Sequence, residues 1–367
     1  MRLRQERRLK MRPFDRVRST IAGQAVDHLA AQPMVMMFAA KHAGIPYIDY
    51  TRSGETLAAA QLKIVEDFGI DCVLMCSDPA REVIDIAGDD SVKWFDDQGP
   101  AIAEERAALV DKARLNEFKV PDPHREGRMQ DRIRSIEICR RELAGETSIV
   151  GWVEGPLALA QELRGLNRIM TDIVDDPTFV RDLMDFTSEV AIEYAIAQIE
   201  AGADTIGMSD AAASMLGPGH YRHLVLPWQR RILQSVRDVH PQVILRQHMC
   251  GNVARLIPDM ATLPVDIYEL DFPTDLTAAR AGLGTERVIL GNVSTVTDLL
   301  QGTPKDVEAA AARCHEICGS FHIVGAGCEV SPRTPPENLR ALIRYANEHK
   351  PDSAPTGGFR PAREPTR

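Results

Sequence analysis

His248, Cys250 and the distant Cys328 are the residues of this sequence whose types and spacing best suit chemistry. An imidazole and two thiolates are ligands that zinc favours, and three protein ligands leave a fourth position open for a substrate. His248 and Cys250 are two residues apart at the end of an apolar run, so on a strand both side chains point to one face. From spacing alone, zinc binding and core packing of the thiols are equally good interpretations. Gly325 and Gly327, just before Cys328, favour the metal because glycine lets the backbone approach a bound group closely.

A zinc site of this kind has a definite chemistry. Zinc with one imidazole and two thiolates carries almost no net charge, and it stabilises the thiolate form of a thiol that enters the open position. The sulfur of that thiol is then anionic at neutral pH, and the two thiolate donors beside it keep it rich in electrons. This combination suits alkyl transfer to sulfur.

Polar residues after other apolar runs are candidates for the same site. Asp210 could orient a substrate or act as an acid or base, and it could equally be the N-cap of the following helix. Glu269 and Asp271 share one face of a strand, and either could be a fourth, exchangeable metal ligand or part of a surface pair. Asn292 could hydrogen-bond a substrate. Three further residues in these turns are candidates for lining a cofactor site: Gly155, Ser209 and Gly327.

Cys314 and Cys318 form a rival metal-binding pair, because they lie one helical turn apart on the same face. They sit in the middle of an expected helix, however, and away from the ends of the expected strands. We therefore expect them to pack in the core, as we expect of Cys72.

The composition is that of a large globular chain. With 367 residues and 44% hydrophobic content it can bury a sizeable core, and its seven cysteines lack the dense spacing of a disulfide framework. A net charge of −10 argues against a surface for nucleic acids. Residues 1–12 are basic without an apolar stretch, so we expect neither a signal peptide nor a membrane anchor, and reduced thiols in the cytoplasm. We expect residues 13–350 to form one domain and residues 351–367 a disordered tail.

Short apolar runs alternate with longer stretches of helical periodicity, which is typical of an α/β fold. Eight runs are expected strands: 33–38, 71–75, 148–153, 205–208, 243–249, 266–270, 287–291 and 321–325. Eight strands at this chain length indicate a (β/α)8 TIM barrel, in which functional groups lie at the carboxyl ends of the strands. A doubly wound open sheet would explain the alternation too, but it gives no reason for polar and metal-binding groups after so many strands.

Capping signals mark several helix starts. Asp176, Thr303 and Thr334 each precede a proline and are expected N-caps, with Glu337 completing a capping box after Thr334. The charged segment 94–134 is expected to be an insertion between early strands, which could cover the mouth of the barrel.

Several short motifs follow one another in a recognisable order along the chain. They are Gly155-Pro156-Leu157-Ala158-Leu159-Ala160, Asp176-Pro177, Ser209-Asp210, His248-Met249-Cys250-Gly251-Asn252, Gly291-Asn292-Val293, Gly327-Cys328 and Thr334-Pro335-Pro336-Glu337-Asn338. Together they resemble the uroporphyrinogen decarboxylase superfamily, over a range from about Met11 to Ala346. The resemblance implies a (β/α)8 barrel, in agreement with the strand count.

The same resemblance separates two branches of the superfamily. The decarboxylase branch holds its substrate's carboxylates with an arginine-containing segment after the first strand, whereas this chain has Met36 to Lys41 there, without arginine. That branch also has a tyrosine where this chain has Gln161 to Leu163, and a histidine in the region of Cys328. The other branch comprises zinc-dependent corrinoid methyltransferases, including methylcobalamin:coenzyme M enzymes. Their motif of His-x-Cys and a distant Cys matches His248, Cys250 and Cys328, which implies these three as zinc ligands.

The methyltransferase resemblance implies transfer of a methyl group between a corrinoid, methylcobalamin, and a thiol or similar acceptor, with Asp210 and Asn292 orienting the acceptor. The corrinoid would arrive on a partner corrinoid protein or free, because no Asp-x-His-x-x-Gly corrinoid module appears in the chain. Two alternatives stay open: decarboxylation of a tetrapyrrole or other carboxylated substrate through Asp210, and corrinoid or tetrapyrrole binding without turnover. The identity of the methyl donor and acceptor, and a homodimeric state, are open as well.

Overall fold

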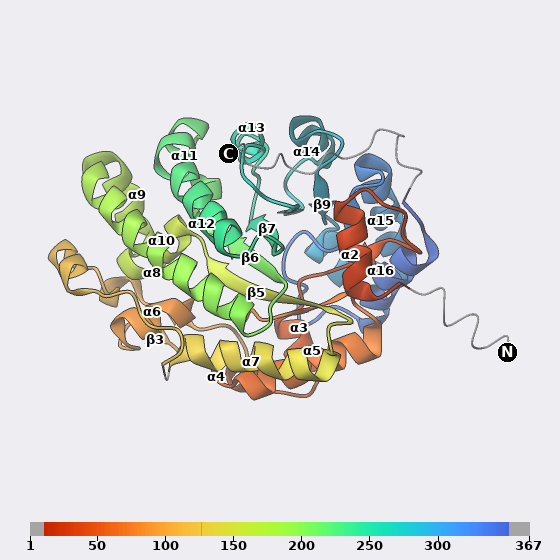
Figure 1. Ribbon diagram of the computed structural model, residues 1–367, viewed down its shortest axis with the longest axis horizontal. Helices are drawn as coiled ribbons and strands as arrows, with labels where there is room; N and C mark the ends of the chain where they lie inside the picture. Colours follow the sequence, from red (N-terminus) through yellow and green to blue (C-terminus); the bar gives the residue numbers. More distant parts are fainter. Residues whose placement is uncertain (1–10, 126, 352–367) are drawn as a thin grey trace.

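A parallel eight-stranded sheet forms the centre of the molecule in the computed structural model, which describes residues 11–125 and 127–351 (Figure 1). Its strands, in spatial order, are β1 (Ala30–Ala31), β10 (His322–Val324), β9 (Val288–Leu290), β8 (Ile267–Leu270), β7 (Ile244–Met249), β6 (Thr205–Ser209), β5 (Ser148–Glu154) and β2 (Cys72–Leu74). β1 and β2 approach each other where the Asp71 amide donates to the Ala31 carbonyl at 2.9 Å. The sheet is therefore a nearly closed barrel.

The predicted (β/α)8 barrel is confirmed, and the doubly wound alternative is wrong. Neighbouring strands follow the order of the chain around the barrel, whereas a doubly wound sheet reverses its strand order at one point.

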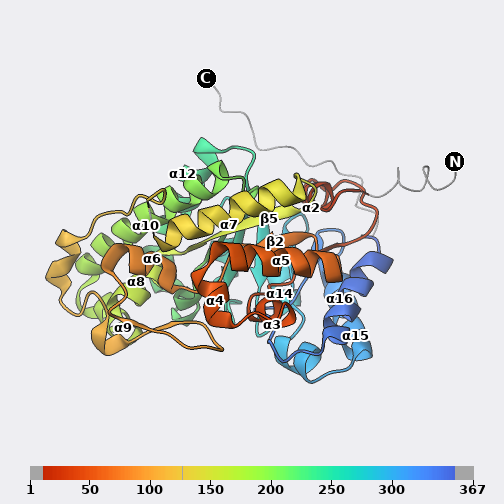
Figure 2. The same cartoon turned by 90° about the horizontal axis from the view of Figure 1, so that it is seen from below.

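Helices surround the barrel, as the two views at right angles show (Figures 1 and 2). They are α2 (Pro13–Ile21), α3 (Met37–His42), α4 (Tyr47–Arg52), α5 (Gly54–Phe68), α6 (Ala80–Ala87), α7 (Arg128–Leu143), α8 (Pro156–Arg164), α9 (Leu166–Asp175), α10 (Pro177–Glu200), α11 (Pro218–Leu224), α12 (Leu226–Val239), α13 (Ile257–Met260), α14 (Leu276–Leu283), α15 (Pro304–Cys318) and α16 (Pro336–Glu348). Two single turns matter for the site: η3 (Ala211–Met215) after β6 and the π-helical η4 (Thr295–Leu300) after β9.

Seven of the eight expected strands overlap strands of the structure, and the first one does not. The run at 33–38 is a loop leading into α3, and the strand lies just before it at Ala30–Ala31. Two alanines carry little strand signal because they are neither β-branched nor aromatic, so the more apolar run beyond Pro33 was the stronger candidate.

Two of the three predicted helix caps are confirmed. The Asp176 side chain accepts from the Phe179 amide at 3.2 Å, and Thr303 forms a capping box with Asp306. The third prediction is wrong, because α16 begins at Pro336 with Pro335 as its N-cap and no side-chain cap. The Thr334 hydroxyl is buried without a hydrogen-bond partner.

The predicted insertion lies between α6 and α7, although α7 already begins at Arg128. The connection between α6 and α7 contains a two-stranded hairpin, β3 (Val92–Lys93) with β4 (Ala101–Ile102), and two short 3-10 turns, so it begins before the predicted residue 94. Lys112 donates to Asp176 at 2.8 Å, and the segment 120–124 lines a hollow with the outer face of α10. Lys112 also pairs with Asp172 of α9, so residues 112–124 lie against α9 and α10, and the cover of the mouth stays a prediction.

Inward-facing side chains fill the barrel in layers. At its amino-terminal end Ile244, Ile267, Val288 and Ile323 pack against Val17 of α2, which closes that end. Two residues further along each of β7 and β8, Arg246 and Glu269 form a buried ion pair. His248 lies two residues beyond Arg246 on β7. The layers therefore change from apolar to charged to metal-ligating toward the carboxyl ends of the strands.

The predicted extension 1–12 and tail 351–367 lie, except for residues 11, 12 and 351, outside the described residues, and the predicted boundaries stay predictions. Within the described part, helices long and apolar enough to cross a membrane are absent.

Candidate metal centre

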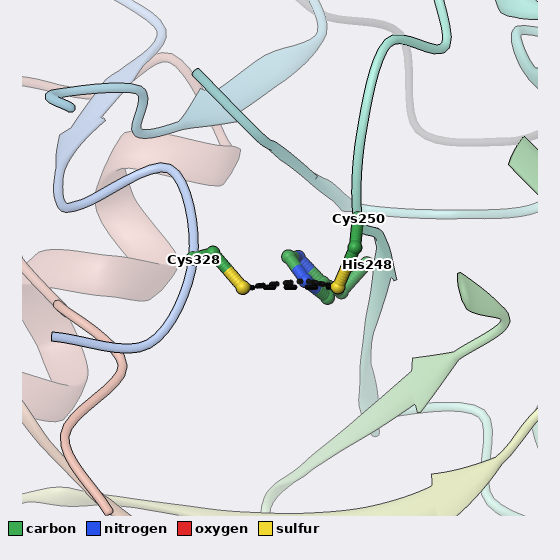
Figure 3. Close-up of side chains that lie close together, drawn as sticks. All are labelled: His248, Cys250 and Cys328. Atoms are coloured by element: carbon green, nitrogen blue, oxygen red, sulfur yellow. Dashed lines mark hydrogen bonds between the residues drawn. The ribbon is translucent and has the colours of Figure 1, made fainter. Parts of the chain in front are cut away.

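His248, Cys250 and Cys328 meet at the carboxyl end of the barrel (Figure 3). His248 Nε2 lies 3.2 Å from Cys250 Sγ and 3.8 Å from Cys328 Sγ, and the two sulfurs are 3.7 Å apart. His248 lies on the inner face of β7, one residue before its end, and Cys250 follows that strand. Cys328, 78 residues further along the chain, follows β10. The barrel thus brings the three predicted ligands into one group.

The donor atoms fit a tetrahedral zinc ion. Zinc binds sulfur at about 2.3 Å and nitrogen at about 2.0 Å, which in a tetrahedron separates two sulfurs by about 3.8 Å and sulfur from nitrogen by about 3.5 Å. The measured separations lie close to these values. Among the described residues, this is the one group of three or more histidine, cysteine or acidic side chains that could hold a metal.

The group is more open on the cysteine side than on the histidine side. His248 is 2% exposed, whereas both cysteines are half-buried, so a fourth ligand would enter from the mouth of the barrel. Burial lowers the pKa of His248, but the Glu269 carboxylate and Cys328 outweigh it and the pKa is raised. The hydrogen bond with Cys250, together with burial, raises the pKa of the Cys328 thiol, and a bound metal would reverse that by favouring the thiolate.

Glu269 lies behind the imidazole. Its Oε2 is 3.4 Å from His248 Nδ1, on the ring edge opposite the cysteines, and Arg246 holds both of its oxygens at 2.9 and 2.5 Å. A carboxylate in this position selects the tautomer that leaves Nε2 free to bind a metal. The structure therefore does not bring Glu269 into the metal-facing group, where we predicted a fourth ligand.

Asp271, the other predicted fourth ligand, is also outside the group. Its Oδ2 accepts from the Gly251 amide at 2.6 Å, and its Oδ1 accepts from the Phe272 amide at 2.7 Å. Both oxygens hold the backbone beside Cys250, so the carboxylate supports the metal-binding loop.

Two glycines allow the cysteine loops to form. Gly251 has φ +86°, a left-handed conformation that other residues rarely adopt, and it follows Cys250 directly. A Cβ on Gly327 would lie 2.3 Å from the Phe272 amide nitrogen, so only glycine lets the two chains approach beside Cys328. Gly327, predicted to line a cofactor, thus has its free side occupied by protein backbone.

Asp210 is fully buried and has partners for both carboxylate oxygens. It accepts from the Ala158 amide at 2.8 Å and from Gln229 Nε2 at 2.7 Å, and burial raises its pKa to about 6. It therefore supports the first turn of α8 instead of capping η3, the turn that follows it. Gly155 makes room for this contact, because a Cβ there would lie 2.6 Å from the Asp210 Cβ.

Asn292 and Ser209 lie near the mouth in different roles. The Asn292 amide donates to the carbonyls of Asp271 at 3.2 Å and Thr274 at 2.9 Å, so it fixes the loop after β8. Ser209 pairs in register with His248 on one side and Glu154 on the other, so the three lie in one row across the barrel.

Sequence reasoning missed a set of buried charges on the other half of the mouth. Arg81 of α6 lies 3.7 Å from Glu82 and 3.6 Å from Glu154, and all three are buried. Burial and the neighbouring Glu82 raise the pKa of Glu154 well above its usual range. Arg246 was missed as well, although a lone arginine within the apolar run 243–249 is a usable signal of a buried ion pair.

The rival pair Cys314 and Cys318 is buried in α15, as expected. Cys314 Sγ lies 3.8 Å from Asn292 Oδ1, and neither thiol belongs to the metal-binding group.

The chain belongs to the uroporphyrinogen decarboxylase (URO-D) family, whose model matches residues 12–349. This confirms the resemblance that the motifs predicted, over nearly the same range.

The proteins to which this chain is similar include methyltransferases and, separately, decarboxylases. Methylcobamide:CoM methyltransferase MtbA of Methanosarcina mazei is 29% identical over 226 residues, which is 61% of this chain and 65% of that protein. Uroporphyrinogen decarboxylase of Chloroflexus aurantiacus is 26% identical over 327 residues, or 84% of this chain and 87% of that protein. The match to the methyltransferase spans less than two thirds of its length.

The fold is shared with a solved structure, a methyltransferase from Methanosarcina mazei. It matches with a TM-score of 0.78 at 22% identity, over 92% of this chain and 99% of that one. This likeness supports the barrel fold.

Proposed function

We propose that this protein is a zinc-dependent methyltransferase that moves a methyl group between a corrinoid and a thiol or similar acceptor. The observation that carries the proposal is the group of one imidazole and two thiols at zinc-binding separations, open toward the mouth of the barrel. The similarity to methylcobamide:CoM methyltransferases supports it further.

A zinc ion held by His248, Cys250 and Cys328 would supply a Lewis acid that lowers the pKa of an acceptor thiol. The acceptor thiol would lose its proton to solvent and take the methyl group of methylcobalamin, and the electron pair of the carbon–cobalt bond would stay on cobalt. Glu269 and Arg246 hold the imidazole in place for this chemistry. Asp271 and Asn292 hold the loops on which Cys250 and the mouth depend.

Asp210 and Asn292 are proposed to act through positioning. Asp210 has both oxygens occupied, so we propose that it orients the acceptor indirectly, through the start of α8. The corrinoid is proposed to arrive on a partner protein, and a reducing compartment such as the cytoplasm suits the free thiols.

Decarboxylation is the second candidate, because decarboxylases of the same family are similar over much of the chain. The segment Met36 to Lys41, partly in α3, has no arginine for substrate carboxylates, and the carboxylate of Asp210 is enclosed. Both observations favour methyl transfer.

Cys328→Ser tests the proposal, with Cys318→Ser as the control because Cys318 is a buried thiol outside the metal group. We expect about one zinc per chain in the wild type and in the control, and loss of zinc together with methyl transfer from methylcobalamin to a thiol in Cys328→Ser. Metal content by elemental analysis and thioether formation by mass spectrometry are the measurements. Full zinc content in Cys328→Ser would refute the assignment of the ligands.

A further inference from the structure

Cys250 and Cys328 are the two cysteines of this chain that solvent reaches most easily. Both are half-buried, whereas the other five cysteines are buried. Cys250 follows β7 and Cys328 follows β10, yet their Sγ atoms lie 3.7 Å apart (Figure 3). The candidate metal centre therefore combines two accessible thiols that touch each other, an arrangement suited to oxidation as well as to metal binding.

The two sulfurs are close enough to bond after a rotation of their side chains. A disulfide holds its sulfurs about 2.0 Å apart, so the two Sγ atoms need to approach by about 1.7 Å, which rotations about the Cα–Cβ bonds can supply. Backbone contacts hold both loops in place. The Gly251 amide donates to Asp271 at 2.6 Å, and the Gly327 amide donates to the Val293 carbonyl at 2.9 Å. These bonds join protein groups, so they do not depend on a bound metal.

We propose that Cys250 and Cys328 form a reversible disulfide when the site meets a hydroperoxide, and that this disulfide releases the metal and stops methyl transfer. This inference rests on the proposed function for the metal and the reaction, although the disulfide itself needs neither a methyl donor nor an acceptor. Zinc binds thiolates, and a disulfide offers none. Of the three ligands in the group, His248 alone would then be left.

The reaction balances with a hydroperoxide as the oxidant. A bound metal holds both sulfurs as thiolates, the form that attacks a peroxide. When one sulfur attacks, a sulfur–oxygen bond forms and the oxygen–oxygen bond breaks, and its electron pair leaves with the other oxygen, which takes up a proton. The second sulfur then attacks the first, and the sulfenic oxygen leaves as water. With hydrogen peroxide, two thiols are oxidised to one disulfide while the peroxide is reduced to two molecules of water.

The contact between the two sulfurs decides whether the oxidation is reversible. A sulfenic acid without a neighbouring thiol is oxidised further to a sulfinic acid, which thiols do not reduce. Here the second sulfur is already beside the first, so the disulfide forms within the chain. A thiol compound reduces this disulfide by exchange, and two of its molecules leave as their own disulfide. The acceptor thiol of the proposed function is such a compound, so abundant acceptor would reopen the site.

The test treats the zinc-loaded, full-length protein with hydrogen peroxide. Mass spectrometry of peptides under non-reducing conditions identifies the linked cysteines, and a chromogenic chelator measures released zinc. We expect linked peptides that contain Cys250 and Cys328, with about one zinc released for each disulfide. Methyl transfer should be lost to the same extent and should return after dithiothreitol and zinc are added. Cys318→Ser, which removes a buried thiol, is the control and should behave as the wild type does.

Cys250→Ser shows whether the neighbouring thiol protects Cys328. Without its partner, Cys328 should be oxidised to sulfinic and sulfonic acids that dithiothreitol does not reduce. Mass spectrometry of the peptide that contains Cys328, before and after dithiothreitol, measures this loss. At the same dose of peroxide, the irreversibly oxidised fraction should be several-fold larger than in the wild type and in Cys318→Ser. If Cys250→Ser does not fold, the peptide map of the wild type decides the question by itself.

The outcomes separate the switch from the proposed function. Methyl transfer that survives peroxide, with both thiols still free, would overturn the switch and leave the proposed function standing. Sulfinic acid on either cysteine without a link between them, or a disulfide between other cysteines, would overturn it as well. A disulfide between Cys250 and Cys328 that releases zinc, in a protein whose untreated form transfers no methyl group, would uphold the release of the metal and refute the proposed function.

Discussion

The two ends of the barrel interior are built from the same strands and differ in chemistry. β7 contributes Ile244 to the amino-terminal layer, Arg246 to the middle and His248 to the carboxyl end, all on its inner face. β8 contributes Ile267 and then Glu269 in the same way. Because inward-facing residues alternate along a strand, four positions separate Ile244, which packs, from His248, which can bind a metal.

This difference shows that the two ends of the barrel have separate roles, one in stability and one in the candidate metal site. Most side chains of the amino-terminal layer are apolar, and the polar Ser148 and Thr205 hydrogen-bond each other there, so this layer contributes mainly free energy of folding. The carboxyl end holds polar groups that are costly to bury, and the charged middle layer of Arg246 and Glu269 connects the two. Substitutions at the carboxyl end should therefore lower the affinity for zinc, whereas substitutions at the amino-terminal end should lower the free energy of unfolding.

The largest expected effect is that of Cys250→Ser on metal binding. We expect zinc affinity to fall by more than the roughly 10–100-fold that loss of an outer partner of a ligand costs, because a direct ligand is removed. Stability of the metal-free protein should stay within about 0.5 kcal/mol, since Cys250 is half-buried. Zinc affinity is measured by competition with a chelating dye, and stability by urea unfolding. Cys72→Ser, a buried thiol, is the control that should keep its zinc; equal zinc loss in both variants would contradict the site.

Ile267→Ala at the amino-terminal end should show the reverse pattern. The side chain is fully buried in the apolar layer, so its truncation should lower the free energy of unfolding by roughly 2–5 kcal/mol. Zinc affinity of the folded protein should be unchanged. Urea unfolding of the metal-free protein gives the stability, with the exposed Val239→Ser as control. A variant that keeps its stability but loses zinc would break the division between the two ends.

Glu269→Gln tests the layer between the two ends. Glutamine keeps the shape of the side chain but removes the charge that faces His248 Nδ1 and Arg246. We expect zinc affinity to fall roughly 10–100-fold, the usual cost of losing the partner of a ligating histidine. Competition with a chelating dye measures this affinity. The control is Glu316→Gln, which changes an exposed residue of α15 and should leave the zinc affinity unchanged. Affinity equal to that of the wild type would mean that the carboxylate does not support the histidine.

Much of this arrangement could be predicted from the sequence, and the reasons are specific. Strand ends marked by β-branched and apolar runs placed His248, Cys250 and Cys328 together, because in a barrel every strand ends at the same mouth. β1 was misplaced because two alanines carry no strand signal.

The roles of the acidic residues could not be predicted. Glu269, Asp271 and Asp210 were correctly expected near strand ends, but the partner of a carboxylate depends on packing between distant segments. Arg81 and Glu82 carry no sequence signal at all, because their burial results from the way α6 packs at the mouth.

Glu162 of α8 gives the smallest expected effect and extends the comparison to pH. Burial, with the nearby charges of Asp78 and Glu82, raises the pKa of Glu162 from its usual 4.5 to about 7. The folded protein therefore binds a proton here more tightly than the unfolded chain does. This contribution to stability is fully present below about pH 4.5 and is lost as the pH rises through about 7.

Glu162→Gln should remove that dependence, because the amide does not titrate. The decrease in the free energy of unfolding between pH 5 and pH 8, chosen as roughly the ends of the window, should be smaller in Glu162→Gln than in the wild type. Glu316→Gln, in which the carboxyl lost is an exposed one, should follow the wild type. Urea unfolding at the two pH values measures the difference. Parallel changes in all three proteins would show that ionisation of Glu162 costs no stability, and that the acidic groups at the mouth are better solvated than their burial indicates.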